Sequence, residues 1–226
     1  MLYGPRPNSR RLLLVLSMAA AAAVVLVASG CGSSQLVSSG IPGGTATTTQ
    51  VVAGRYLVLG YGCAGCHNRG KVDPTDPLWL AGYTAGTQGQ PFTVLGFQTY
   101  ASNLTVDTTT GIGSYTDLQI YNALKFGLDP AFTASQTITS STPGQGNYPA
   151  QPHYLAPPMP WPSYQHLDDV DLWSIVSYLK HGIKAVSNTV PPSQAPADFW
   201  ASYYSVANVG PSAIPAYPEG NEVFSP

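Results

Sequence analysis

Five consecutive residues, Cys63-Ala64-Gly65-Cys66-His67, have the types and the spacing that covalent haem attachment requires. Thiols at positions i and i+3 lie on the same side of a helical turn, where both can add to the vinyl groups along one edge of a haem. The histidine that follows then lies below the iron and provides the proximal axial ligand. The motif therefore predicts one haem c, attached covalently at Cys63 and Cys66 and ligated by His67.

Two other kinds of site use a pair of thiols at this spacing: half of a zinc site and a redox-active dithiol. A zinc site needs further thiolate or imidazole ligands at matching spacing, and the sequence has no cysteine after Cys66. A redox dithiol normally lies in a βαβ unit, which the sequence pattern does not predict. The haem interpretation is therefore favoured over both.

The ligand on the other face of the iron separates electron transfer from catalysis. Met159 is the one methionine after the N-terminal 31 residues, and three prolines surround it in the stretch 156–160. Because prolines fix the backbone, this thioether is held in place, as a ligand should be. The alternative is a Met that only fills a gap in the core. The sequence predicts Met159 as the sixth ligand.

Three histidines compete with it: His153, His166 and His181. His153 is the main competitor because it lies in the same loop, whereas His181 ends a helix, where a cationic His is expected in any case.

With these motifs, the sequence resembles the bacterial class I cytochromes c from Val51 to His181. The matching elements are Cys63–His67, Ser102–Thr105, Thr110–Gly113, Met159–Trp161 and a helix end at Tyr178–Lys180. The Asn-Leu-Thr and Gly-Ile-Gly elements are similar to membrane-bound cytochrome subunits that serve dehydrogenases and respiratory complexes. The sequence departs from them at Val106, where those usually have Pro, and in a Ser/Thr/Gly/Gln-rich insertion over residues 130–153.

The resemblance implies a mostly α class I cytochrome c fold: few short helices around one covalent haem, long irregular loops and a Pro-rich C-terminal extension. In that family the first and last helices cross and hold the haem crevice, which the resemblance implies for Gly54 and for the region of Trp173 and Tyr178.

The resemblance also implies partners for the haem and for its ligand. Nδ1 of His67 should donate to a backbone carbonyl shortly after the motif, with Pro74 or Pro77 as candidates. The candidate propionate partners are Trp161, Tyr164 and Arg69. Each of the three could equally be an ordinary packing or surface residue.

Hydrophobic periodicity predicts three short helices that position these residues. The first directly precedes the motif, with Val52, Tyr56 and Leu59 at helical spacing. The second begins at a capping box over residues 116–119 and ends at Gly127; its apolar stripe is Leu118, Tyr121 and Leu124.

The third helix has the clearest pattern. Its apolar residues at i, i+3, i+4 and i+7 are Leu172, Ile175, Val176 and Leu179. Acidic residues (Asp168, Asp169 and Asp171) precede them, and Lys180 and His181 follow. These charges complement the helix dipole at both ends.

Residues 1–30 have the three parts of an export signal, with arginines before an apolar run and small residues after it. The run from Leu12 to Val27 extends about 24 Å as a helix, shorter than a bilayer core of about 30 Å. Ala28-Ser29-Gly30-Cys31 resembles the lipobox of bacterial lipoproteins, which implies lipidation of Cys31. An uncleaved anchor helix with an incidental Cys is the alternative. Both place the protein on the extracytoplasmic (periplasmic) face of a bacterial membrane.

The sequence divides into four segments. Residues 1–30 form the lipoprotein signal sequence, and residues 31–49 form a flexible Ser/Thr/Gly tether from the lipidated Cys31. Residues 50–184 form the cytochrome c domain. Residues 185–226 form a Pro- and aromatic-rich extension, whose aromatic side chains must pack either on the cytochrome domain itself or on a neighbouring subunit. We favour the neighbour and expect a docking segment.

Composition excludes several classes of protein. Charged residues make up 9% of the 226 residues, whereas a typical soluble domain has about 25%. The chain contains 23 Gly and 21 Pro, too many for a coiled coil or a large helical bundle. The net charge is -2 and no run of basic residues occurs, which excludes nucleic acid as a partner.

We therefore expect a membrane-anchored monohaem cytochrome c that transfers single electrons and is not itself an enzyme. A thioether opposite His67 would close the coordination shell and raise the reduction potential. The expected partners are the membrane, a redox carrier protein and other subunits of a respiratory or photosynthetic complex, such as a quinol-oxidising alternative complex. The alternative function is a haem enzyme or gas sensor with a labile distal ligand, for which His153 is the candidate.

Overall fold

The computed structural model describes residues 45–86, 91–196, 198–213 and 217–223. The predicted signal sequence, Cys31 and most of the predicted tether lie outside the described residues. The first helix begins at Thr48, so the last two residues assigned to the tether are helical.

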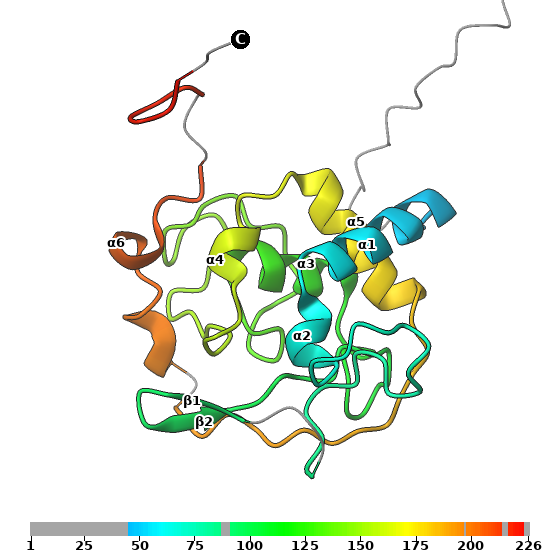
Figure 1. The fold of residues 1–226 in the computed structure, drawn as a ribbon. Helices are drawn as coiled ribbons and strands as arrows, with labels where there is room; N and C mark the ends of the chain where they lie inside the picture. Colours follow the sequence, from blue (N-terminus) through cyan, green and yellow to red (C-terminus); the bar gives the residue numbers. More distant parts are fainter. Residues whose placement is uncertain (1–44, 87–90, 197, 214–216, 224–226) are drawn as a thin grey trace, which may run out of the picture. The chain divides into compact units, whose positions relative to one another are not determined.

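The regular structure of the described residues is mostly helical, with few and short helices, as predicted (Figure 1). The helices are α1 (Thr48–Gly60), α2 (Cys63–His67), α3 (Asp117–Phe126), α4 (Trp161–Tyr164), α5 (Asp169–His181), the 3-10 turn η1 (Phe199–Ala201) and α6 (Val206–Val209). Strands β1 (Phe92–Val94) and β2 (Phe97–Thr99) pair antiparallel, with Phe92 opposite Thr99. None of the described helices is both long and apolar enough to cross a membrane.

Helices α1 and α5 cross at Gly54, as predicted (Figure 1). A Cβ atom at Gly54 would lie 1.8 Å from the carbonyl oxygen of Ser174 and 2.8 Å from Cβ of Tyr178. The Tyr178 hydroxyl in turn accepts a hydrogen bond of 2.9 Å from the indole N–H of Trp79. The crossing therefore joins the two helices to the segment that follows the haem motif.

The buried face of α1 differs from the predicted one. Val52 and Tyr56 are 63% and 76% exposed, whereas Gln50, Gly54 and Val58 are buried. The helix is apolar on more than one side, so periodicity alone does not select the face that is buried. The close approach to α5 selects it, because only Gly54 permits that approach.

The other two predicted helices are confirmed. Thr116 and Gln119 form the capping box of α3, and Gly127 ends that helix in the left-handed conformation. All four residues of the predicted apolar stripe of α5 are buried. At the end of α5, Lys180 donates to the carbonyls of Ile112, Gly113 and Tyr115, which joins this helix to the Gly-Ile-Gly segment.

The buried aromatics of the C-terminal extension pack on their own chain, so the favoured expectation of a neighbouring subunit is wrong for them and the alternative holds. Trp200 is 2% exposed and shares a core cluster with Tyr204 and Trp161. In β2, Gln98 accepts a backbone hydrogen bond of 3.0 Å from Gln194. Exposed apolar side chains remain on the extension at Tyr203, Val206, Tyr217 and Val223.

Replacing Gly54 by Ala should separate α1 from α5. The added Cβ meets the backbone of α5, which cannot rotate away as a side chain can, so we expect a loss of about 3 kcal/mol in the free energy of unfolding. Denaturant unfolding of the purified protein measures this change.

Gly60→Ala is the matched control in the same helix. A Cβ at Gly60 meets nothing within 4 Å in the part of the chain that the structure describes, and Ala has the higher helix propensity, so this variant should be at least as stable as the wild type. Equal destabilisation by both substitutions would contradict the role assigned to the crossing.

Candidate haem site

The predicted motif forms a helical turn of its own, α2, which begins directly after Gly62. Gly62 takes a left-handed conformation (φ 73°), which lets the chain turn sharply from α1 into α2. The Cys63 and Cys66 thiols are free, and the sulfur of Cys63 lies 4.0 Å from the Tyr164 hydroxyl. Burial raises the pKa of the Cys63 thiol, an effect that the hydrogen bond with Tyr164 reduces.

His67 is buried, and its ring is oriented by one hydrogen bond. Nδ1 donates to the backbone carbonyl oxygen of Ser102 at 2.8 Å. Burial lowers the pKa of His67, and the Ser102 carbonyl acts in the opposite direction. With Nδ1 protonated in this bond, Nε2 of the neutral ring carries the lone pair that a metal ligand needs.

The acceptor is a backbone carbonyl, as the resemblance implied, but it belongs to neither of the two predicted residues. Pro74 and Pro77 lie in the turn that follows α2, whereas Ser102 is 35 residues away from His67. Ser102 lies in the Ser-Asn-Leu-Thr element, and that element was the one sequence signal that pointed to this segment.

Gly82 brings its own segment close both to His67 and to the segment that contains Ser102. Its N–H donates to the carbonyl oxygen of His67 at 2.8 Å. Its φ is +83°, and a Cβ there would lie 2.6 Å from the Ala101 carbonyl oxygen and from the carbonyl carbon of Ser102. Gly82 therefore holds the main chain of His67, and Ser102, which lies against Gly82, holds its ring.

The predicted Ser-Asn-Leu-Thr and Thr-Gly-Ile-Gly elements also meet. Asn103 is 2% exposed, and its amide donates to Thr110 Oγ1 at 3.1 Å. The N–H of Ile112 donates to the Thr105 carbonyl at 2.9 Å, and a Cβ at Gly111 would lie 2.3 Å from that same oxygen. The glycines therefore allow one loop to lie directly on the other.

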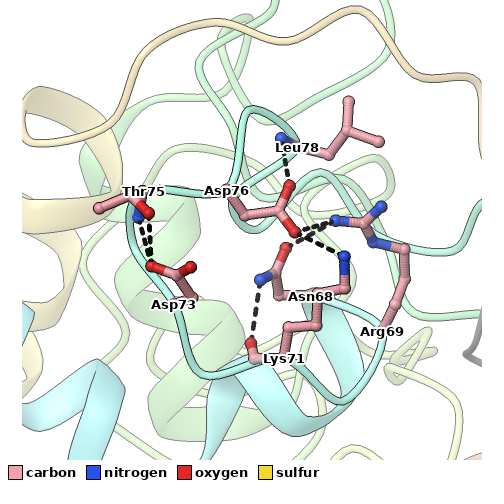
Figure 2. A network of polar contacts seen from close by, with 7 residues as sticks. All are labelled: Asn68, Arg69, Lys71, Asp73, Thr75, Asp76 and Leu78. Carbon is pink, nitrogen blue, oxygen red and sulfur yellow. Dashed lines mark hydrogen bonds and ion pairs between the residues drawn. The ribbon is translucent and has the colours of Figure 1, made fainter.

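A polar network closes the turn after α2 (Figure 2). Arg69 and Asp76 form an ion pair of 2.9 Å, with side chains 5% and 9% exposed. The other carboxylate oxygen of Asp76 accepts from the N–H of Leu78 at 2.8 Å. That hydrogen bond, with the guanidinium of Arg69, lowers the pKa of Asp76. The network fixes the path from the motif toward Gly82.

Met159 lies on the same core cluster as Cys63, and its loop is fixed at several points. Its N–H donates to the Ala156 carbonyl at 3.2 Å. The Thr99 hydroxyl, which is buried, donates to the Pro157 carbonyl at 2.9 Å. A Cβ at Gly127 would lie within 2.4 Å of three atoms of the Trp161 indole, so the end of α3 makes room for this loop.

The three competing histidines have different surroundings. Nδ1 of His153 is buried without a hydrogen-bond partner among the described residues, and its ring packs on Phe132 at 4.6 Å. His166 Nε2 lies 3.3 Å from the Gln165 amide. His181 lies 3.5 Å from the carboxylate of Asp117 at the surface.

The three candidate propionate partners take on other contacts. Arg69 is paired with Asp76, Tyr164 contacts Cys63, and Trp161 stacks on Tyr154 at 5.7 Å in the cluster that holds the C-terminal extension.

The donor set fits a c-type haem. Such a haem uses two thiols, an imidazole and a thioether. The site has two free thiols one helical turn apart, an imidazole whose Nδ1 is bonded to a carbonyl, and a thioether on the same core cluster. The zinc alternative requires a different set, and among the described residues no three His, Cys, Asp or Glu side chains come together as a metal site.

Comparisons with known proteins agree with this assignment. The chain is 30% identical over 146 residues to the fructose dehydrogenase cytochrome subunit of Gluconobacter japonicus, covering 65% of this chain and 24% of that protein. It is 28% identical over 146 residues to the gluconate 2-dehydrogenase cytochrome c subunit of Pantoea cypripedii, covering 65% of this chain and 26% of that protein. The chain is homologous to bacterial c-type cytochrome subunits.

A third relative is the cytochrome c subunit of the quinone-dependent alcohol dehydrogenase of Gluconacetobacter polyoxogenes. The identity is 29% over 101 residues, covering 45% of this chain and 17% of that protein. No family model matches the chain. The chain spans about a quarter, or less, of the length of these relatives. All three relatives are named as cytochrome subunits of dehydrogenases, which agrees with the prediction of a cytochrome.

Replacing Gly82 by Ala should disturb the support of His67. The new Cβ would meet the backbone of residues 101–103, and a non-Gly residue at this φ adds about 1 kcal/mol of strain. We expect the free energy of unfolding to fall by about 3 kcal/mol or more in total, as measured by denaturant titration.

Gly86→Ala separates the effect of backbone strain from the effect of the contact with residues 101–103. Gly86 has a similar φ of +77°, but a Cβ there meets no atom of the described residues within 4 Å, so only the loss from strain should remain. If both variants lost the same stability, the contact of Gly82 with the Ser102 segment would have no energetic importance.

Proposed function

We propose that the chain is a membrane-anchored monohaem cytochrome c with a class I fold, which transfers single electrons as a subunit of a membrane oxidoreductase complex. The observation that carries this proposal is the His67 ring, buried in a C-x-x-C-H turn and held through Nδ1 on the Ser102 carbonyl. When bound, a c-type haem supplies a one-electron iron couple whose potential depends on the axial ligands and their hydrogen bonds.

Each residue has one role in this proposal. Cys63 and Cys66 hold the haem through thioethers, and Nε2 of His67 binds the iron. The Ser102 carbonyl fixes the ring orientation and increases the basicity of the imidazole. Within these 226 residues the three cysteines are Cys31, Cys63 and Cys66, which supports one covalently attached haem.

Met159 is the sixth ligand in this proposal. The hydrogen bonds that fix its loop support this assignment, because a ligand held in place loses little conformational entropy on binding. A thioether there would leave no open position for a substrate or gas, and it favours a high reduction potential. This arrangement suits a relay of electrons.

The complex that the protein serves is proposed from its relatives. These are cytochrome subunits of fructose, gluconate and alcohol dehydrogenases, so a dehydrogenase complex is favoured over a quinol-oxidising alternative complex or a photosynthetic one. In this proposal Cys31 carries the lipid, the protein lies on the periplasmic face of the membrane, and a redox carrier protein accepts its electrons.

Replacing Met159 by Ala tests the sixth ligand. We expect the wild-type protein to have a low-spin c-type spectrum with a weak near-infrared band from sulfur ligation, and no response to carbon monoxide when reduced. The variant should lose that band, become high-spin and bind carbon monoxide, because the iron then has an open position.

The His153→Ala variant is the control for Met159→Ala, and it also tests His153 as the competing ligand. If Met159 is the ligand, this variant keeps the wild-type spectrum. A wild-type protein that binds carbon monoxide, or a His153 variant that becomes high-spin, would favour the alternative of a haem enzyme or gas sensor with a labile distal ligand.

Replacing Cys31 by Ala tests the anchor. Without the thiol no lipid can be attached, so the wild type should incorporate radiolabelled fatty acid in cells and the variant should not. A mature wild-type protein without the label, whose mass still includes residues 1–30, would indicate that residues 12–27 remain as an uncleaved anchor helix.

A further inference from the structure

The first residues of the C-terminal extension lie on the segments that support His67. Residues 186–188, which we call the strap, include Asn188, whose side-chain amide donates to two backbone carbonyls. These are the carbonyls of Ala81 at 2.7 Å and Tyr83 at 2.9 Å. The residue between them is Gly82, whose N–H donates to the His67 carbonyl at 2.8 Å.

A second asparagine makes the reciprocal contacts. Asn103 directly follows Ser102 and donates to the Val186 carbonyl at 2.8 Å. The N–H of Val186 donates to Thr105 Oγ1 at 3.0 Å, and the N–H of Asn188 donates to Thr110 Oγ1 at 3.0 Å. The strap is therefore bound to the residues that follow Ser102 as firmly as to those that flank Gly82.

The two supporting segments are also paired with each other. The N–H of Tyr83 donates to the Ala101 carbonyl at 2.8 Å, and the N–H of Leu104 donates to the Leu80 carbonyl at 2.9 Å. Two backbone hydrogen bonds between short irregular segments do not by themselves form a stable unit. The side-chain amide of Asn188 adds two part-buried hydrogen bonds to residues 81 and 83, while the main chain of the strap is held by Asn103, Thr105 and Thr110.

We propose that Asn188 is a positioning residue for the proximal imidazole. By fixing residues 81–83 against residues 101–104, it holds the Ser102 carbonyl on Nδ1 of His67. This inference rests on the proposed haem ligation by Nε2 of His67. The bond to Nδ1 increases electron donation from the ring, which stabilises the oxidised iron, so a looser bond raises the reduction potential.

The test uses the haem-loaded Asn188→Ala variant of the full chain. Nuclear magnetic resonance of the reduced protein measures the rate at which the Nδ1 proton of His67 exchanges with solvent, and a redox titration measures the midpoint potential. Loss of one intramolecular hydrogen bond changes an opening equilibrium by a factor of about five. Loss of the two side-chain bonds should therefore speed this exchange by about tenfold or more, and the midpoint potential should rise.

Asn208→Ala is a closely matched control. Like Asn188, it donates two side-chain hydrogen bonds to backbone carbonyls. The acceptors are Ser202 at 3.0 Å and Tyr203 at 3.1 Å, which lie in an exposed turn of the extension itself. This variant should keep both the wild-type exchange rate and the wild-type potential. If Asn188→Ala also left both unchanged, the strap would have no part in positioning His67.

A measurement on the wild-type protein decides the question if the Asn188 variant does not yield holoprotein. We expect the amide protons of Val186 and Asn188 to exchange with the same free energy of opening as the Nδ1 proton of His67. A strap that opens more easily while His67 stays protected would overturn the inference. Carbon monoxide binding by the wild type would refute the proposed sixth ligand, yet leave this comparison valid, because Nδ1 does not bind the iron.

Discussion

The structure depends on the hydrogen bond between Nδ1 of His67 and the carbonyl oxygen of Ser102. A buried imidazole needs a partner for its N–H, and a metal ligand needs its other nitrogen free. One bond of 2.8 Å meets both needs, but it joins residues 35 positions apart, so the backbone must be rigid at both ends. The helical turn α2 provides that rigidity at His67, and tight packing around Gly82 provides it at Ser102.

Neutral amide side chains provide several cross-links in a chain with few charges. Asn68 donates to the Lys71 carbonyl at 2.9 Å, beside the Arg69–Asp76 ion pair (Figure 2). Gln119 donates to the carbonyls of Pro130 and Thr133, which orders the start of the long insertion. Buried carbonyls in irregular loops must find donors, and Asn and Gln supply two N–H groups without the desolvation penalty of a charge.

The stretch from β2 to Ser102 connects both candidate iron ligands. Thr99 holds the carbonyl of Pro157 in the Met159 loop, and Ser102 holds the ring of His67. Gln98 of the same stretch exchanges hydrogen bonds with Gln194 of the C-terminal extension. The extension is thus part of the scaffold around the site, and its aromatic cluster packs on Trp161 near Met159.

The sequence by itself determined the features that depend on neighbouring residues: the C-x-x-C-H turn, the capping box and Gly stop of α3, and the apolar stripe of α5. Caps, periodicity and short motifs act within one or two helical turns, so local sequence is sufficient to predict them. Only the tertiary structure decided which carbonyl holds His67, which face of α1 is buried, and where the aromatics of the extension pack. Each of these results from contacts between residues far apart in the chain, which local patterns do not encode. The close approach of backbones at Gly54 selects the face of α1, and the close approach at Gly82 brings the Ser102 carbonyl to His67.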